Sequence, residues 1–464
     1  MADVYKVTRS DMVSVADAIR ERAKTSDQLV FPNEFVTAIN NLGVSGATLT
    51  VTTQSEGITA TVTKGEMSYT KATGSDGTAV FSGLENGTWT ITISDGSNTE
   101  TDTVDLVADY TKALSFLKIY GIYRDITSSS PSWGREDDAV GMTATASVGT
   151  VAGSSDFSNC YPWNGIQRET LSTGDVMVKI PKFWFRRYRD GNIEHIKIAN
   201  RAEYGFTLHP AFNHAGVEKD YLYVGAYKTS SNNKSVSGAS PQVSQTRATF
   251  RTNAKSKGTG WGLTDIAALS AIQMLIMVEF ATNNVQAAIG RGYCDSNSAA
   301  ISTGSCNSVA NLTGRPSGTD GKVDVVWRGI EGLWGNVWEW VDGVNWNNGT
   351  YYVCNDHSKY ADNTATNYTA LSYMGATNWS SSYITQEGLD TGDNEHVMLP
   401  ADAGGGSEST YYCDACWSST GWRVFRRGGI WLDGSLCGLF TAVSIDTSSN
   451  SYDNIGSRLL YIPQ

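Results

Sequence analysis

The sequence predicts an α+β protein of three parts: a small helical segment over residues 1–45, an all-β domain over 46–116 and a large mixed domain over 117–464. Composition is the first reason. Charged residues make up only 18% of the 464 residues, whereas glycine occurs 47 times and tryptophan 14 times, which favours a loop-rich β or α+β protein over a helical bundle. The second reason is the pattern along the chain, in which short alternating strands are followed by one long apolar helix over 261–281.

The charge balance and the apolar pattern exclude several classes of partner. The formal net charge is −12, and no Lys- or Arg-rich run occurs. Binding of nucleic acid requires a positive surface, so we expect no nucleic-acid partner. We also expect no membrane insertion and no signal peptide, because no stretch approaches the length of a membrane span and charged residues interrupt residues 1–19. Seven scattered cysteines favour reduced thiols over a disulfide framework.

Residues 1–45 have the spacing of two short helices. Ser10, a residue suited to cap a helix, precedes the first apolar stripe, and Gly43 ends the second. Two such helices bury little surface by themselves, so the segment is either a cap on the next domain or an attachment piece. The stretch TSDQLVFPNEFVTAINNL resembles amino-terminal segments of phage tail and fibre proteins.

Residues 46–116 alternate apolar and polar side chains in short runs separated by turns. The clearest turn signals are GSDG at 74–77 and GLENG at 83–87, and Trp89, Ile91 and Ile93 alternate with threonines after the second turn. Seven short strands at this spacing predict a sandwich. The sequence GSDGTAVFSGLENGTWTITI resembles immunoglobulin-like, prealbumin-type modules of surface proteins, which implies a spacer domain.

The third part contains the elements that we expect to form the main core. It begins with a strand over 119–123 and continues with an aromatic strand over 176–187, in which Pro181 marks an edge or a bulge. A polar loop over 228–257 is expected to be exposed. Asp265 or Thr264 is suited to cap the long helix. A dense aromatic block, WRGIEGLWGNVWEWVDG, begins at Trp327.

The last segment, residues 421–464, has a regular frame and an irregular middle. It opens with RRGG at 426–429 and closes with NIGSR at 454–458. The side chains in between follow no single periodicity. Val443 and Ile445 fit a core strand as well as a surface, but Asp433 and Asp446 interrupt any clean core pattern. We therefore favour a binding face.

Two motifs carry a resemblance to a known family. GLWGNVWEWVDG at 332–343, followed by GWRVFRRGG at 421–429, resembles the formylglycine-generating-enzyme/sulfatase-modifying-factor family, which implies a C-type-lectin-like fold for 117–464. Enzymes of that family place two cysteines after the Arg-Gly-Gly motif to bind copper, because copper(I) requires soft thiolate ligands. Here Asp433 takes the first position and only Cys437 lies near the second. We therefore expect no metal, no cofactor and no enzyme activity, and a copper oxidase of this type is the alternative.

A closer resemblance lies within the same fold. The frame made by RGG, CGLF, SSNS and NIGSR resembles the variable proteins of diversity-generating retroelements, in which mutation at adenines diversifies Asn codons within a fixed frame. This resemblance implies a variable region at about 427–458. It also implies a ligand-binding surface composed of Ile430, Leu432, Asp433, Ser435, Leu436, Thr441, Val443, Ile445, Asp446, Thr447 and Tyr452.

The resemblance also implies a function. Such proteins act as receptor-binding tips of phage tails or as binders displayed on bacterial cells. For this chain it implies a phage tail protein in the virion that recognises a bacterial surface receptor, either a protein or a glycan. Contacts with other tail proteins through residues 1–45 and assembly as a homotrimer are the accompanying expectations. Display on a bacterial surface is the alternative.

Three further groups of residues have two interpretations each. Cys413 and Cys416 have the CxxC spacing, but no second pair lies at a usable distance, so they are structural thiols or a loop disulfide. The acidic loop LDTGDNEHVMLPAD at 389–402 either holds a cation or is a solvated face. His209 and His214 are expected to be structural. The sequence triplets of calcium-dependent lectins do not occur, so we expect no calcium site.

Overall fold

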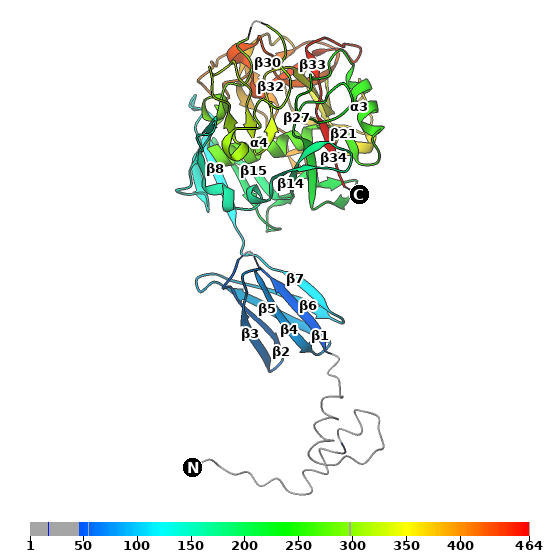
Figure 1. The fold of residues 1–464 in the computed structure, drawn as a ribbon. Helices are drawn as coiled ribbons and strands as arrows, with labels where there is room; N and C mark the ends of the chain where they lie inside the picture. The colour runs from blue at the N-terminus through cyan, green and yellow to red at the C-terminus, as the bar shows by residue number, and fades with distance from the viewer. Residues whose placement is uncertain (1–16, 18–45, 54, 297, 464) are drawn as a thin grey trace. The chain divides into compact units, whose positions relative to one another are not determined.

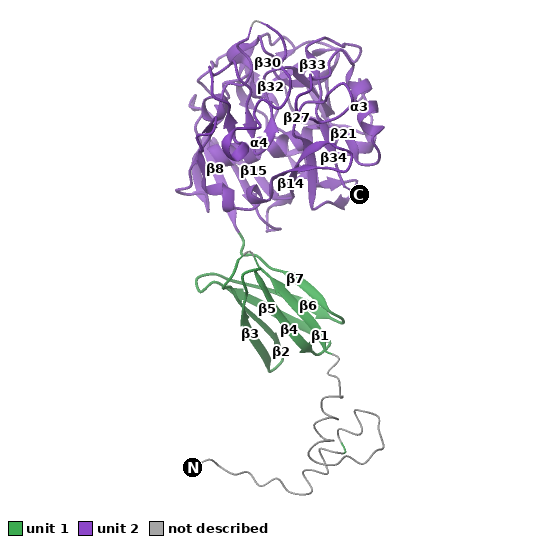
Figure 2. Cartoon of the chain, viewed as in Figure 1, with its two compact units in different colours: residues 1–117 green, residues 118–464 purple. Residues whose placement is uncertain are grey.

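The computed structural model describes residues 17, 46–53, 55–296 and 298–463, and the chain divides into two compact units, residues 1–117 and 118–464 (Figures 1 and 2). The helices predicted within residues 1–45 lie outside the described residues, which include only Asp17 of that segment. The two units are described separately below.

The first unit contains two sheets around one core. A three-stranded sheet has the order β4-β1-β7, in which β7 runs parallel to β1, and a four-stranded sheet has the order β3-β2-β5-β6. Alternate residues of β1, β2, β4 and β5 point inward, and Trp89, Ile91 and Ile93 of β5 are completely buried. The strands are β1 (Ala47–Thr52), β2 (Thr59–Lys64), β3 (Met67–Ala72), β4 (Thr78–Leu84), β5 (Gly87–Ser94), β6 (Thr99–Leu106) and β7 (Tyr110–Ala113).

The second unit consists mostly of β-strands, with a few helices. One five-stranded sheet contains, in spatial order, β13 (Gln167–Thr170), β14 (Val176–Pro181), β20 (Tyr221–Gly225), β34 (Leu459–Tyr461) and β21 (Trp261–Leu263). Another contains β17 (Thr207–Leu208), β15 (Trp184–Asp190), β16 (Ile193–Ala199), β8 (Ile119–Asp125) and β9 (Gly134–Asp137). The single aromatic strand predicted over 176–187 is thus two strands of different sheets, because β14 ends at Pro181, which has no N–H to donate.

A nine-stranded sheet carries the carboxyl-terminal segment. Its order is β27 (Thr369–Met374), β26 (Thr350–Val353), β25 (Trp338–Asn347), β31 (Trp422–Gly428), β32 (Gly438–Asp446), β30 (Ala415–Ser418), β28 (Ser382–Glu387) and β29 (Pro400–Ala403), and β33 (Ile455–Gly456) pairs with β25. Strands β26, β27, β28 and β29, which lie at the two ends of this sheet, all come from residues 350–403.

Shorter elements complete the unit. Small sheets are formed by β11 (Ser147–Val148), β22 (Gly314–Arg315), β23 (Val326–Trp327) and β24 (Ile330–Glu331), by β10 (Ala144–Thr145) and β12 (Ser154–Ser155), and by β18 (Asn213–His214) and β19 (Val217–Glu218). The 3-10 helices are η1 (Asp156–Asn159), η2 (Trp163–Gly165), η3 (Pro210–Phe212), η4 (Ala310–Leu312), η5 (His357–Lys359), η6 (Gly392–Asn394) and η7 (Gly434–Leu436).

Helix α4 (Ile266–Phe280) lies at the centre of the core. Asp265 caps it by accepting a hydrogen bond from the backbone N–H of Ala268 at 2.8 Å, and Ala281, in the left-handed conformation, ends it. All residues of α4 from Ile266 to Glu279 are buried. The buried helix is therefore present, but its predicted start at Trp261 is wrong, because Trp261–Leu263 pairs with β34 as strand β21.

Two further α-helices among the described residues of the second unit lie in segments that the sequence pattern did not identify as helical. Helix α3 (Arg247–Lys255) occupies part of the loop expected over 228–257, capped by the Thr246 hydroxyl, which accepts from the N–H of Thr249 at 3.1 Å. Its Phe250 and Ala254 are buried, so only one side of this polar helix faces solvent. The short helix α5 (Val285–Ile289) follows α4.

Candidate ligand-binding surface

The segment predicted to be variable lies across the middle of the nine-stranded sheet. Strand β31 pairs antiparallel with β25 on one side and with β32 on the other. The connection from β31 to β32 carries η7, and the chain then returns to β33, which runs parallel to β25. Residues 427–458 therefore begin and end beside the same strand, β25.

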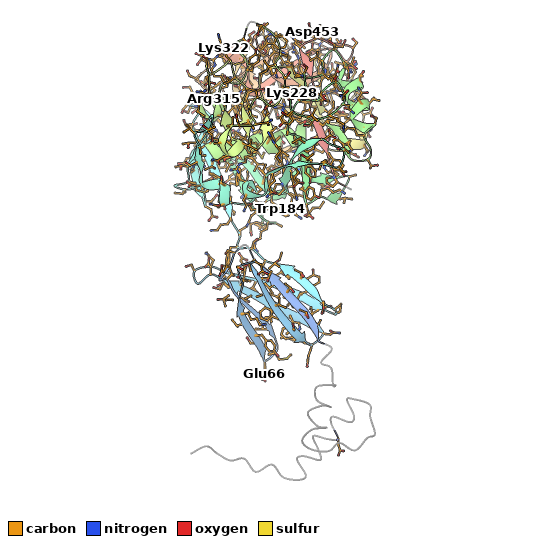
Figure 3. All side chains as sticks on the ribbon, viewed as in Figure 1. Glu66, Trp184, Lys228, Arg315, Lys322 and Asp453 are labelled. Carbon is orange, nitrogen blue, oxygen red and sulfur yellow. The ribbon has the colours of Figure 1, made fainter. Side chains whose placement is uncertain are left out.

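A buried carboxylate of β25 joins the two ends of this segment. Glu339 accepts from Arg427 Nη2 at 2.8 Å and from Arg458 Nη2 at 2.7 Å, and Lys228 Nζ approaches it at 3.0 Å. Lys228 lies in the interior of the unit (Figure 3). Burial alone raises the pKa of Glu339, but the three cations outweigh burial and hold the pKa well below its usual value. The frame is thus anchored to the core by charge-assisted hydrogen bonds.

The glycine pair of the frame turns the chain out of β31. Gly428 and Gly429 have φ values of +90° and +86°, which L side chains rarely adopt. A Cβ on Gly429 would also overlap the sulfur of Cys437. The two glycines of the RRGG motif are therefore required by the backbone path.

A cavity of about 460 Å³ is lined by residues of β25, β30, β31 and β32 and of the loops before and after β32. Five of the residues predicted to form the surface line it: Ile430 and Asp446, which are buried, Asp433, which is half-buried, and Ile445 and Tyr452, which are exposed. The remaining lining residues are Trp338, Trp417, Arg426, Asp453 and Asn454. Asp453 lies at the periphery of the unit (Figure 3).

Aromatic and charged side chains contact one another in the lining of this cavity. Arg426 Nε donates to Asp446 Oδ2 at 2.6 Å, and its guanidinium lies 4.3 Å from the ring centroid of Trp338. Trp417 meets Trp338 edge to face, with ring centroids 5.9 Å apart. Such a surface offers both apolar contact and hydrogen bonds to a ligand.

Asp433 is a half-buried carboxyl group in the lining of the cavity. Burial raises its pKa, although its Oδ2 accepts a hydrogen bond from the N–H of Ile430 at 2.9 Å. This bond closes the turn that leads into η7. Asp433 therefore shapes the connecting loop as well as lining the cavity.

The predicted residues outside the cavity occupy two environments. Leu432, 55% exposed, projects from the connecting loop, whereas Ser435, Leu436 and Thr447 are half-buried. The Ser435 hydroxyl lies 2.9 Å from the hydroxyl of Tyr383, and Thr447 contacts Asn450. These four positions and the five in the cavity lie in the loops before and after β32 and at its end.

Thr441 and Val443 are not surface residues, contrary to the prediction. Each is only 1% exposed. The Thr441 hydroxyl donates to the carbonyl of Leu436 at 2.9 Å, and Val443 packs in a cluster with Trp338 and Trp340. The physical reason is that β32 runs between β30 and β31, which cover both of its edges, and that consecutive residues from Gly438 to Ser444, pointing to both faces of the sheet, are buried.

Several cavity residues lie outside the segment that the sequence pattern identified. Trp417 belongs to β30, which pairs in parallel with β32. Trp338, expected in the core, is indeed buried in a core cluster and also lines the cavity. No local pattern distinguishes these two tryptophans from the other twelve of the chain's 14. Only the order of strands in the sheet brings them to the cavity.

The structure contains no disulfide bond among the seven cysteines, all of which are described. All seven are free, including Cys413 and Cys416. The Cys437 thiol contacts that of Cys294, and burial raises the pKa of Cys437. Among the described residues, no group of three or more His, Cys, Asp or Glu side chains is placed to hold a metal ion.

A search for membrane-spanning segments gave a negative result within the described residues: none of their helices has the length and apolar character needed to cross a bilayer.

Comparisons with known proteins gave matches to solved structures alone. No family model and no curated protein matches the chain. The chain is similar to the Major Tropism Determinant P3c variant, with 15% sequence identity, 81% of each chain covered and a TM-score of 0.25. It is also similar to the U1 variant, with 16% identity, 81% of each chain covered and a TM-score of 0.24, and to the M1 variant, with 16% identity, 80% of each chain covered and a TM-score of 0.25.

Proposed function

We propose that this protein is a receptor-binding protein whose residues 427–458 form a variable binding surface on a C-type-lectin-like domain. The observation that supports the proposal is the contrast between the anchored ends of this segment and its exposed middle. Arg427 and Arg458 hold its two ends to Glu339 in the core, while Leu432, Ile445 and Tyr452 in between are exposed. A scaffold anchored in this way tolerates exchange of the exposed side chains.

The chemistry of the cavity supports recognition of a structured surface ligand. Trp338, Trp417 and Tyr452 supply aromatic contact area, and Arg426 and Asp446 supply hydrogen bonds. Antibody paratopes combine the same two kinds of group, because rigid aromatic side chains cost little conformational entropy and polar ones adapt to the ligand. The ligand in the proposal is a receptor on a bacterial surface, either a protein or a glycan.

The rest of the chain has a role in the same proposal. The protein is a phage tail or fibre-tip component of the virion, residues 1–45 attach it to other tail proteins, and the immunoglobulin-like unit is a spacer. In a homotrimer, three receptor-binding surfaces would bind at the same time, so contacts that are weak individually would give strong attachment together. If a retroelement diversifies residues 427–458, the flanking DNA must contain a near copy of the segment that encodes them. This copy must differ at adenines and lie beside a reverse-transcriptase gene.

Binding to bacterial cells tests the function directly. The variant that combines Leu432→Ala, Ile445→Ala and Tyr452→Ala should lose at least about tenfold in retention on a strain that the fluorescently labelled wild-type protein binds, since each exposed anchor contributes on the order of 1 kcal/mol. Its free energy of unfolding should change little, because exposed side chains contribute little to stability.

The matched control replaces exposed apolar residues elsewhere on the same unit, Val151, Tyr204 and Val217, by alanine. This control should bind like the wild type. Equal retention of both triple variants would show that residues 427–458 do not form the receptor-binding surface.

A further inference from the structure

A second cavity, of about 630 Å³, lies outside the proposed variable surface. It is bounded by the edge strands β26 and β27, by the residues around η5 and by the first part of the acidic loop, and it shares no lining residue with the cavity described above. The sequence left open whether this acidic loop holds a cation or faces solvent. The cavity provides a third possibility.

Two nearly completely buried side chains line this cavity. Each has one polar side-chain atom without a hydrogen-bond partner among the described residues. Asp390, 6% exposed, accepts from the N–H of Ser372 at 3.0 Å through Oδ1, and its Oδ2 has no hydrogen-bond partner among the described residues. Asn394, also 6% exposed, accepts from Asn355 Nδ2 at 3.3 Å through Oδ1, and its Nδ2 has no donor contact within the same part of the chain. The cavity thus presents one free acceptor and one free donor.

The charges around the cavity disfavour an anionic ligand. Asp356, Asp390 and Asp393 line it, whereas Lys359 is the cation in the lining and pairs with Asp356 at 2.8 Å. A phosphate or carboxylate would meet this excess of carboxylates and be repelled. Phosphorylated and acidic sugars are excluded for the same reason.

A cationic ligand fits the cavity poorly. No group of three or more His, Cys, Asp or Glu side chains among the described residues is placed to hold a metal ion. An ammonium group would face the charge of Lys359 and would offer no acceptor to Asn394 Nδ2. A hydroxyl group both donates and accepts. Adjacent hydroxyls on one ring satisfy a carboxylate oxygen and an amide N–H at the same time.

We propose that this cavity binds an uncharged saccharide unit, with Asp390 accepting from one ring hydroxyl and Asn394 donating to a neighbouring one. The hydroxyls of Thr369, Ser372 and Thr391 at the rim supply further contacts. The site lies outside residues 427–458, so it recognises its ligand independently of the variable surface.

Ligand-observed saturation-transfer NMR on the full chain tests the proposal, with glucose, galactose, mannose and N-acetylglucosamine as probes. At least one of these neutral sugars should give a transfer signal with the wild-type protein, and glucuronate should give none. The signal should persist in EDTA, because no metal mediates the contact. Absence of signal from all four sugars, a stronger signal from glucuronate, or loss of the signal in EDTA would each overturn the proposal.

Two substitutions locate the binding. Asp390→Asn keeps an oxygen for the Ser372 N–H but removes the carboxylate, and Asn394→Ala removes the free donor. Each should weaken sugar binding by about tenfold, as expected for the loss of one hydrogen bond to a buried charged or polar group. Circular dichroism and the thermal midpoint establish that each variant is folded, and either variant alone suffices for the test.

The matched control is Asp402→Asn, which neutralises an exposed carboxylate of the same acidic loop outside the cavity. It should bind sugar like the wild type. Equal weakening by Asp402→Asn, or unchanged binding by the folded cavity variants, would refute the assignment to this cavity. Tyr452→Ala distinguishes the two sites, because it should leave the sugar signal intact whether or not the proposed receptor surface is right.

Discussion

At the scale of single residues, the second unit contains buried ionisable groups whose protonation is set by their surroundings. Glu387 of β28 is completely buried, and neither of its carboxyl oxygens has a hydrogen-bond partner among the described residues. Burial raises the pKa of Glu387 to about 8, with the charge of Arg187 opposing this shift. The folded protein therefore keeps Glu387 neutral at pH values where the unfolded chain ionises it.

Replacing Glu387 by glutamine should change how stability depends on pH. A carboxyl whose folded pKa is raised contributes stability below its unfolded pKa of about 4.3, and this contribution is lost as the pH rises towards the folded value. Glutamine mimics the neutral acid at every pH. The free energy of unfolding of Glu387→Gln minus that of the wild type should thus increase by about 1.4 kcal/mol per pH unit between the two pKa values and level off above them.

Urea unfolding of both proteins at about one-unit steps of pH measures this difference. Subtracting the wild-type value removes the titration of all other groups, provided that they are unaffected. Glu408→Gln, at an exposed position of the same unit, is the control for the effect of the substitution itself. A difference that does not vary with pH for Glu387→Gln would show that this carboxyl is hydrated in the folded state.

At the scale of elements, the connection between β31 and β32 depends on its first glycines. Gly429 has φ +86° and faces the Cys437 sulfur, whereas Gly421, at the start of β31, has φ +79° with no atom near the position of a Cβ. The two positions share the backbone strain of an L residue but differ in steric overlap. They form a matched pair for testing what the glycine frame contributes.

Gly429→Ala should therefore destabilise the protein more than Gly421→Ala. Both variants carry the left-handed penalty of about 1–2 kcal/mol, and Gly429→Ala should lose at least about 1 kcal/mol more, because crowding in a packed site adds to the strain. Differential scanning calorimetry of the two variants measures this. Equal losses would mean that the Cys437 side chain moves aside without cost, and the RGG frame would then be constrained by conformation alone.

Local sequence patterns identify some of the helices and strands and fail to identify others. The apolar run of α4 and its Asp265 cap are local signals, so the helix and its burial follow from the sequence. Strand β21, directly before it, is equally apolar, and only its pairing with β34, almost 200 residues away, makes it a strand. The polar helix α3 was missed because its few buried residues, such as Phe250, are too sparse to produce a clear stripe.

At the scale of the whole molecule, each of the two units has a core of its own. Trp89 and its neighbours form one core, and the residues around α4 form another. Residues 118–464 include the proposed receptor surface, the sugar cavity and all the strands that position them. Such a unit should fold without the preceding residues.

Expression of residues 118–464 alone tests this expectation. The fragment should unfold in one cooperative transition with a thermal midpoint close to that of the corresponding transition in the full chain, because its own core supplies its stability. A fragment that aggregates or lacks a cooperative transition would show that the division at residue 117 does not separate independent folding units. Residues 46–117 serve as the companion fragment.

The sequence by itself determined the local features of this protein: the strand alternation with its turns, the capped apolar helix, the glycine frame and the segment that contains the exposed Leu432, Ile445 and Tyr452. These follow from periodicity and from backbone requirements, which act between near neighbours. The tertiary structure decided which positions are buried and which meet. It buried Thr441 and Val443 between neighbouring strands, brought Trp417 to the cavity through the parallel pairing of β30 with β32, and joined Arg427 and Arg458 at Glu339. The physical reason is that burial and contact depend on strand order in a sheet, which arises from packing between distant segments and leaves no local periodicity in the chain.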